Sequence, residues 1–176
     1  MFYLKIKCYA TRWIGILSFI YIAHVFGCAS LQVNKGVFSP PHRNYTITLP
    51  GKDWETVRTD KEDIALWHTQ HHAMIIIMSG NTEDRKVSPD ELSRLLFIGM
   101  KNKEILLNES VFVDNRTAMH TILTCEIDNH KLKVESYVIK SGNRVCDIVS
   151  WSSPDLFDYT RKDFENIIKS LRFSIL

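Results

Sequence analysis

The chain has 176 residues, with 22 Lys and Arg against 20 Asp and Glu, and 45% of its residues are hydrophobic. This length fits one domain with a short appendage. Only seven Gly and five Pro, a high apolar content and no persistent heptad exclude collagen, coiled coil and a disordered chain. Four Cys are too few for a disulfide-built scaffold, and a net charge of +2 gives no support to nucleic-acid binding.

The first 27 residues differ from the rest of the chain. They carry three basic and no acidic side chains, so residues 28–176 keep 19 basic against 20 acidic ones. An apolar run from Trp13 to Phe26 follows these cations. A basic start followed by a short apolar stretch predicts an export signal over residues 1–27. The run is shorter than the roughly 20 apolar residues of a membrane span, and an uncleaved membrane anchor is the alternative.

The end of this segment, Val25-Phe26-Gly27-Cys28, resembles the lipobox of bacterial lipoproteins. The resemblance implies cleavage between Gly27 and Cys28, diacylglycerol on the Cys28 thiol and an acyl chain such as palmitate on the new amine. Several acyl chains on one residue anchor a protein stably, whereas a single chain holds it only marginally. Phe26 departs from the pattern, because a small residue usually stands at that position.

The residues after the cysteine predict a tether. Residues 28–43 have no regular pattern and contain Pro40-Pro41, which suits a connection between a membrane and a domain over 44–176. Such an anchor places the domain on the bacterial cell envelope, facing the periplasm, and Ala29 favours the outer membrane over the inner one by analogy with enteric bacteria. The alternative is ordinary signal-peptide cleavage near Ala29 or Ser30, which gives a secreted protein.

The first half of the predicted domain consists of short strands. Residues 45–50 alternate and end in Pro-Gly, and 54–57 continue after this turn. The apolar runs 64–67 and 73–78 have strand length and predict a hairpin or one long bent strand. Because 74–78 has no polar alternation, we expect it to be covered on both faces, as a central strand is.

The second half combines helices with a meander. Ser88-Pro89-Asp90-Glu91 forms a capping box that predicts a helix over about 89–104. A second amphipathic helix begins near residue 155 and reaches Leu171, and 172–176 returns as a short edge strand. Three alternating segments with tight turns between the helices predict an antiparallel meander over 118–127, 132–139 and 144–151.

These elements predict an α+β fold, an antiparallel sheet of five to seven strands with the inserted helix and the C-terminal helix packed on it. The arrangement resembles the fold of PsbP, an extrinsic subunit of photosystem II, and of a small nuclear-import factor that binds the GTPase Ran. The resemblance rests on the strand 45–50 followed by Trp54, the capped helix, the strand 143–151 and the closing segment 164–173. It implies a module that docks on other proteins and usually has no enzymatic activity.

Two groups of side chains are candidates for chemistry. His68, His71 and His72 form the one ligand-like cluster of the sequence, because imidazoles suit Zn or Cu, while a closed zinc site needs four ligands. The same three residues also fit a plain polar turn. Cys125 and Cys146 lie two strands apart in the meander, beyond the roughly 7 Å reach of a disulfide, so we expect two buried free thiols instead of a disulfide.

The leading prediction is a lipid-anchored cell-envelope protein that acts as a non-enzymatic adaptor or accessory subunit beside an envelope protein partner, without a cofactor. A metal-binding envelope protein that uses the three histidines is the alternative from another class. A small hydrolase is a third, but the sequence has no Gly-x-Ser-x-Gly elbow, and Cys125 and His120 are expected on opposite faces of one strand.

Overall fold

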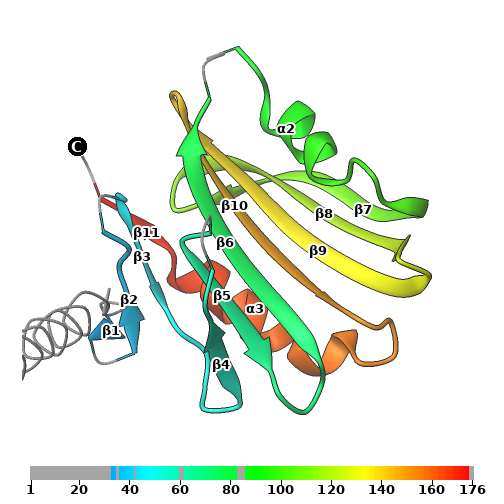
Figure 1. Cartoon of the computed structure of the whole chain (residues 1–176). Coiled ribbons are helices and arrows are strands. Elements are labelled where there is room, and N and C mark those ends of the chain that lie inside the picture. Colours follow the sequence, from blue (N-terminus) through cyan, green and yellow to red (C-terminus); the bar gives the residue numbers. More distant parts are fainter. Residues whose placement is uncertain (1–32, 35, 42, 60–61, 83–85, 175–176) are drawn as a thin grey trace, which may run out of the picture. The chain divides into compact units, whose positions relative to one another are not determined.

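The structure, a computed structural model, describes residues 33–174 apart from positions 35, 42, 60–61 and 83–85 (Figure 1). The predicted signal segment 1–27 lies outside the described residues, and so do its cleavage site at Gly27 and the predicted lipidation site Cys28. Among the described residues, neither helix is long and apolar enough to cross a membrane.

Seven antiparallel strands form the main sheet, in the spatial order β4-β5-β6-β10-β9-β8-β7. Their bounds are β4 Trp54–Val57, β5 Ile64–His68, β6 Ala73–Asn81, β7 Lys101–Val113, β8 Arg116–Ile127, β9 His130–Ser141 and β10 Arg144–Ser152. β5 and β6 form the predicted hairpin, and β8, β9 and β10 form the predicted meander. The prediction of an α+β fold with an antiparallel sheet of five to seven strands is confirmed.

β7 replaces the second half of the helix expected over 89–104, so that prediction is wrong beyond Leu96. The helix stops because Gly99 has a φ of +87°, in the left-handed region that glycine adopts without strain. β7 is an edge strand, and most of its side chains are exposed on both faces. A strand exposed on both faces lacks the apolar–polar alternation by which a half-buried strand is recognised in a sequence.

A second, smaller sheet has the order β1-β2-β3-β11, with β1 Val33–Asn34, β2 Val37–Phe38, β3 Tyr45–Thr48 and β11 Arg172–Phe173. β1 and β2 fall within residues 28–43, which the sequence assigned to a tether. β2 pairs with β3, and the Phe38 side chain is buried in the core. The last part of the expected tether is therefore folded onto the domain. β11 is the short return strand expected after the C-terminal helix.

The two helices begin for different reasons. α2, Pro89–Leu96, starts with the predicted capping box, in which Ser88 Oγ accepts from the Glu91 N–H at 3.2 Å and the Ser88 N–H donates to Glu91 Oε2 at 2.7 Å. These bonds satisfy donors that a helix start leaves without partners, so the start of α2 is set locally. α3, Phe157–Ser170, is unbroken and has no side-chain cap, so burial of its apolar stripe holds it in place.

The helices pack on opposite faces of the main sheet (Figure 1). On the face covered by α3 and the smaller sheet, here called the α3 face, Phe164 and Ile167 pack against Ile75 and Ile148. On the other face, here called the α2 face, Phe97 at the end of α2 packs over β8 and β9 in a smaller cluster. The core therefore has two parts, separated by the sheet.

β6 is less covered than its sequence suggests. Ile75 and Ile77 are fully buried on the α3 face, whereas Met74, Ile76 and Met78 are only half-buried on the α2 face. The expectation that 74–78 is covered on both faces is therefore wrong for the α2 face. The reason is that α2 packs over β8 and β9 and leaves β6 partly open.

Candidate ligand-binding site

The paired ends of β6 and β10 present different residues to the two faces of the sheet. Arg144 pairs with Asn81, and Cys146 pairs with Ser79. Successive side chains of a strand point to opposite faces, so these four residues lie on the α3 face, while Val145 and its neighbours lie on the α2 face. Each face has a hollow at this end of the sheet.

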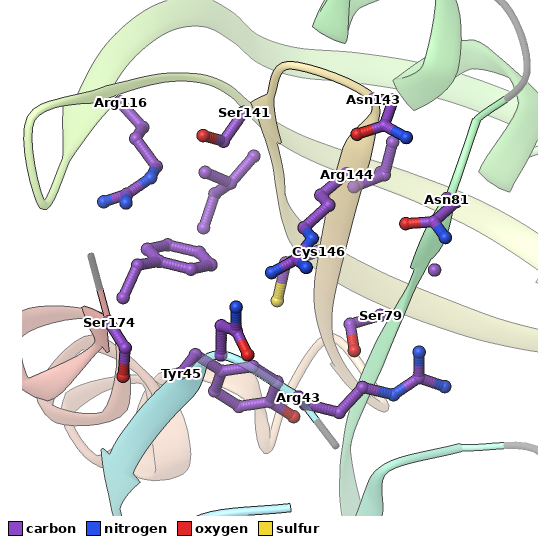
Figure 2. Close-up of a pocket in the computed structure, with 15 residues that line it drawn as sticks. Arg43, Tyr45, Ser79, Asn81, Arg116, Ser141, Asn143, Arg144, Cys146 and Ser174 are labelled. Atoms are coloured by element: carbon purple, nitrogen blue, oxygen red, sulfur yellow. The ribbon is translucent and has the colours of Figure 1, made fainter. Parts of the chain in front are cut away.

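A cavity of about 370 Å³ lies on the α3 face, between the end of the main sheet and the smaller sheet. We call it the arginine cavity, because Arg43 before β3, Arg116 of β8 and Arg144 of β10 all line it. Figure 2 shows these three arginines reaching the cavity from separate segments, with Cys146 and Tyr45 between them. The remaining polar lining comes from amide and hydroxyl side chains, Asn44, Ser79, Asn81, Ser141, Asn143 and Ser174.

The three guanidinium groups are not equally neutralised. Arg43 Nε lies 3.2 Å from Asp63 Oδ1, and Arg116 Nη1 lies 2.9 Å from Asp114 Oδ2. The Arg116 guanidinium also lies 4.3 Å from the centre of the Phe173 ring. No carboxylate among the described residues pairs with Arg144, whose side chain is exposed at the cavity. The cavity therefore keeps a net positive charge.

A buried carboxylate holds the wall of the cavity together. Asp63 Oδ2 accepts hydrogen bonds from the Tyr45 hydroxyl at 2.9 Å and from the Ser79 hydroxyl. The same carboxylate pairs with Arg43, and its side chain is only 5% exposed. Asp63 thus ties the smaller sheet to β6 and fixes one arginine at the cavity.

The ionisable groups in the wall stay protonated at neutral pH. Burial, with the charges of Asp147 and Asp63, raises the pKa of the Cys146 thiol well above its usual value. Burial, followed by Cys146 and by the charge and hydrogen bond of Asp63, does the same to the pKa of the Tyr45 hydroxyl. A thiol acts as a nucleophile in its ionised form, so Cys146 is not activated for covalent chemistry. The cavity presents hydrogen-bond donors and positive charge, which suits binding of an anionic group.

The three histidines proposed from the sequence do not converge on one point. His68 is buried, and its Nδ1 accepts hydrogen bonds from the backbone N–H groups of Gln70 and His71, each at 3.2 Å. The His71 ring stacks on Tyr159 with centroids 5.0 Å apart, while His72 lies against Trp67. No group of three or more His, Cys, Asp or Glu within the described chain has the geometry to hold a metal ion.

The two described cysteines belong to different parts of the core. Cys125 packs with Phe97 in the α2-face cluster, and Cys146 packs in the α3-face cluster. Both thiols are buried and unpaired. The main sheet lies between them, so the fold leaves no route for a bridge.

A buried histidine between two carboxylates was not singled out by its sequence. His120 Nε2 lies 2.8 Å from Glu135 Oε1, and His120 Nδ1 lies 3.2 Å from Glu109 Oε1. The ring stacks on Tyr137 on the α3 face, whereas Cys125 of the same strand packs on the α2 face. Burial lowers the pKa of His120, but the hydrogen bonds to Glu135 and Glu109 outweigh it and hold the pKa above its usual value. This group is a charged structural cluster, without a nucleophile in the contacts described.

The cavity residues come from segments that the sequence gives no reason to join. Arg43 lies in the expected tether, Arg116 and Arg144 each follow a turn, and Asp63 precedes a strand. A hint is available only for Arg144, because the turn before it contains Gly142 with a φ of +63° and places it at the start of β10. Neither the charge nor the spacing of these residues predicts a shared cavity.

No protein-family model and no curated protein matches the sequence. Solved structures share its fold. PsbP (CyanoP) of Synechocystis sp. PCC 6803 is 11% identical, with a TM-score of 0.61 over 84% of this chain and 98% of that one. LpqN of Mycobacterium tuberculosis, which is involved in cell envelope biogenesis, is 12% identical, with a TM-score of 0.61 over 82% of this chain and 95% of LpqN. A Bacteroides thetaiotaomicron protein is 11% identical, with a TM-score of 0.57 over 80% of this chain and 48% of its own.

This likeness shows the fold of the domain. The described strands and helices follow the PsbP-like arrangement that the sequence resembled, and the prediction of a PsbP-like domain is confirmed. Proteins that share a fold at such low identity need not share a site or a ligand.

Proposed function

We propose that this PsbP-like domain is the lipid-anchored, non-enzymatic accessory module of a bacterial cell-envelope assembly, and that it docks on an envelope protein through the arginine cavity. In this proposal an acidic side chain of the partner enters the cavity and pairs with Arg144. The observation that carries it is a cavity of about 370 Å³ whose three arginines outnumber the two carboxylates paired with them.

The location in the envelope rests on two independent features. Val25-Phe26-Gly27-Cys28 resembles a lipobox and follows a segment with the character of an export signal. LpqN, which has the same fold, is involved in cell envelope biogenesis. Together they support an accessory role at the envelope, with Cys28 as the site of attachment.

The cavity is suited to binding rather than to reaction. Its guanidinium, amide and hydroxyl groups donate hydrogen bonds, and the raised pKa of Cys146 keeps the thiol protonated at neutral pH. The Tyr45 hydroxyl is engaged by Asp63, so it does not serve as a free acid or base. A volume of about 370 Å³ admits one or two side chains of a partner.

The docking proposal is tested with a pair of peptides. A Glu-rich peptide and a Gln-rich peptide of equal length are titrated into the protein by calorimetry at low salt. A hydrogen bond between charged groups contributes about 1.5–3 kcal/mol, so we expect the Glu peptide to bind and Arg144→Gln to weaken it at least tenfold. Arg94→Gln is the matched control, because Arg94 pairs with Asp90 on the surface of α2. Equal loss in both variants, or equal affinity for both peptides, would overturn the docking proposal.

The anchor is tested on the full chain expressed in a bacterium. We expect the wild-type protein in the membrane fraction, with an intact mass that shows loss of residues 1–27 and added lipid. Cys28→Ala should be unlipidated and should leave that fraction. A soluble wild-type protein with an unmodified mass contradicts the lipid anchor without affecting the docking experiment.

A further inference from the structure

The α2 face has its own hollow at the same end of the sheet. It has a volume of about 480 Å³ and lies beside α2, at the part of β6 that this helix leaves uncovered. Apolar side chains of three elements line it, Met78 of β6, Val145 of β10 and Leu92 of α2. The one titratable residue in its lining is Asp147 of β10, and we call this site the Asp147 hollow.

The Asp147 carboxylate lacks a partner inside the described domain. Its Oδ1 is buried, and no described group lies within hydrogen-bond distance of it. Burial raises the pKa of Asp147 to about 6, and no neighbouring charge contributes to this shift. Buried polar atoms in folded proteins are nearly always hydrogen-bonded, so an orphaned carboxylate oxygen beside a hollow calls for a functional explanation.

Every element packed around Asp147 presents apolar groups to it, apart from one lysine nearby. In the strand register its neighbours are Met78 on β6 and Val138 on β9. Lys140 is the nearest cation along β9 on this face, but its ammonium donates to the carbonyl oxygen of Val87. The carboxylate therefore has no cation from its own chain to balance its charge.

We propose that the Asp147 hollow binds a small molecule that carries a positively charged amine on an apolar body. The ammonium group supplies the hydrogen bond and the charge that the Asp147 carboxylate lacks. The apolar body replaces water along Met78, Leu92 and Val145. Neutral alcohols and carboxylic acids of the same length lack the charge and are excluded. This site lies on the opposite face from the arginine cavity and does not depend on the proposed function.

Three probes of one length test the proposal, hexylammonium, hexanol and hexanoate. Each is titrated into the wild-type domain at pH 7.5, with ¹H–¹⁵N NMR shifts of the β6 and β10 amides as the readout. We expect hexylammonium to bind with shifts centred on Val145 and Asp147, hexanol to bind at least tenfold more weakly and hexanoate not to bind. Equal binding of hexanol, or shifts centred elsewhere, would overturn the proposal.

Two further measurements separate the role of the charge from a fault in folding. Asp147→Asn should weaken hexylammonium binding at least tenfold, while Asp155→Asn, at an exposed position before α3, leaves it unchanged. In the wild-type protein, ¹³C NMR titration of the Asp147 carboxyl should show its pKa falling when hexylammonium is saturating. An unchanged pKa in that experiment contradicts the proposal even if the variants do not fold.

Discussion

The two hollows at the end of β6 and β10 are built from neighbouring residues yet have opposite electrostatic character. Arg144 and Cys146 face the arginine cavity, while Val145 and Asp147 face the hollow beside α2. The alternation of a strand places consecutive side chains on opposite faces. One short segment can therefore supply a cationic site on one face of the sheet and an anionic site on the other.

The two sites differ most in how their acids are treated. Asp63 beside the arginine cavity accepts two hydroxyl hydrogen bonds and pairs with Arg43. Asp147 beside the other hollow has none of these partners among the described residues. A satisfied buried carboxylate stabilises the fold, whereas an unsatisfied one destabilises it. Removing each acid should thus have effects of opposite sign, which is the sharpest way to test the contrast.

The largest effect is expected for Asp63→Ala. This change leaves the buried Tyr45 hydroxyl and the Arg43 guanidinium without their acceptor. Breaking a buried ion pair costs about 3–5 kcal/mol, so the free energy of unfolding should fall by about 3 kcal/mol in urea denaturation. Asp155→Ala is the control and should change it by less than about 0.5 kcal/mol. A similar small change in Asp63→Ala would show that the wall of the cavity does not depend on this acid.

The second effect has the opposite sign. Asp147→Leu should raise the free energy of unfolding at pH 7.5 by about 2 kcal/mol, because it removes a charge held in an apolar setting. The folded-state pKa of about 6 lies above the unfolded value of about 3.9. The contribution of Asp147 is therefore fully present below pH 4 and is lost as the pH rises through 6. Urea denaturation of both proteins from pH 4 to 7.5 measures the difference, and a variant that is less stable than the wild type at pH 7.5 contradicts this account.

The third and smallest effect concerns His120. The folded-state pKa of His120 is raised by Glu135 and Glu109 against the opposing effect of burial, so its contribution to stability is present below the unfolded pKa of about 6.5. It is lost as the pH rises through the higher folded-state pKa. His120→Gln should cost about 1.5 kcal/mol at pH 5.5 and less at pH 8.5. His130→Gln, at an exposed turn, is the control, and a loss that does not depend on pH would show that His120 acts by packing alone.

Several parts of the fold follow from short stretches of the sequence. The Ser88 and Glu91 capping box sets the start of α2, and the turn residues Asp128 and Asn129, with φ of 49° and 65°, separate β8 from β9 as the pattern indicates. The lipobox-like segment also belongs to this class, because its evidence is a run of adjacent residues. Such features depend on near neighbours in the chain, which a sequence displays directly.

The sequence alone thus determined the meander, the start of α2, the PsbP-like order of elements and the prediction of an export signal. Tertiary structure decided the rest. β7 exists because β8 offers it an edge, and Phe38 is buried because β2 pairs with β3. Whether Arg144 stays unpaired and Asp147 stays unsatisfied depends on which distant segments pack around the end of β10. Charge pairing and desolvation are set by neighbours in space, and no local pattern of residues records them.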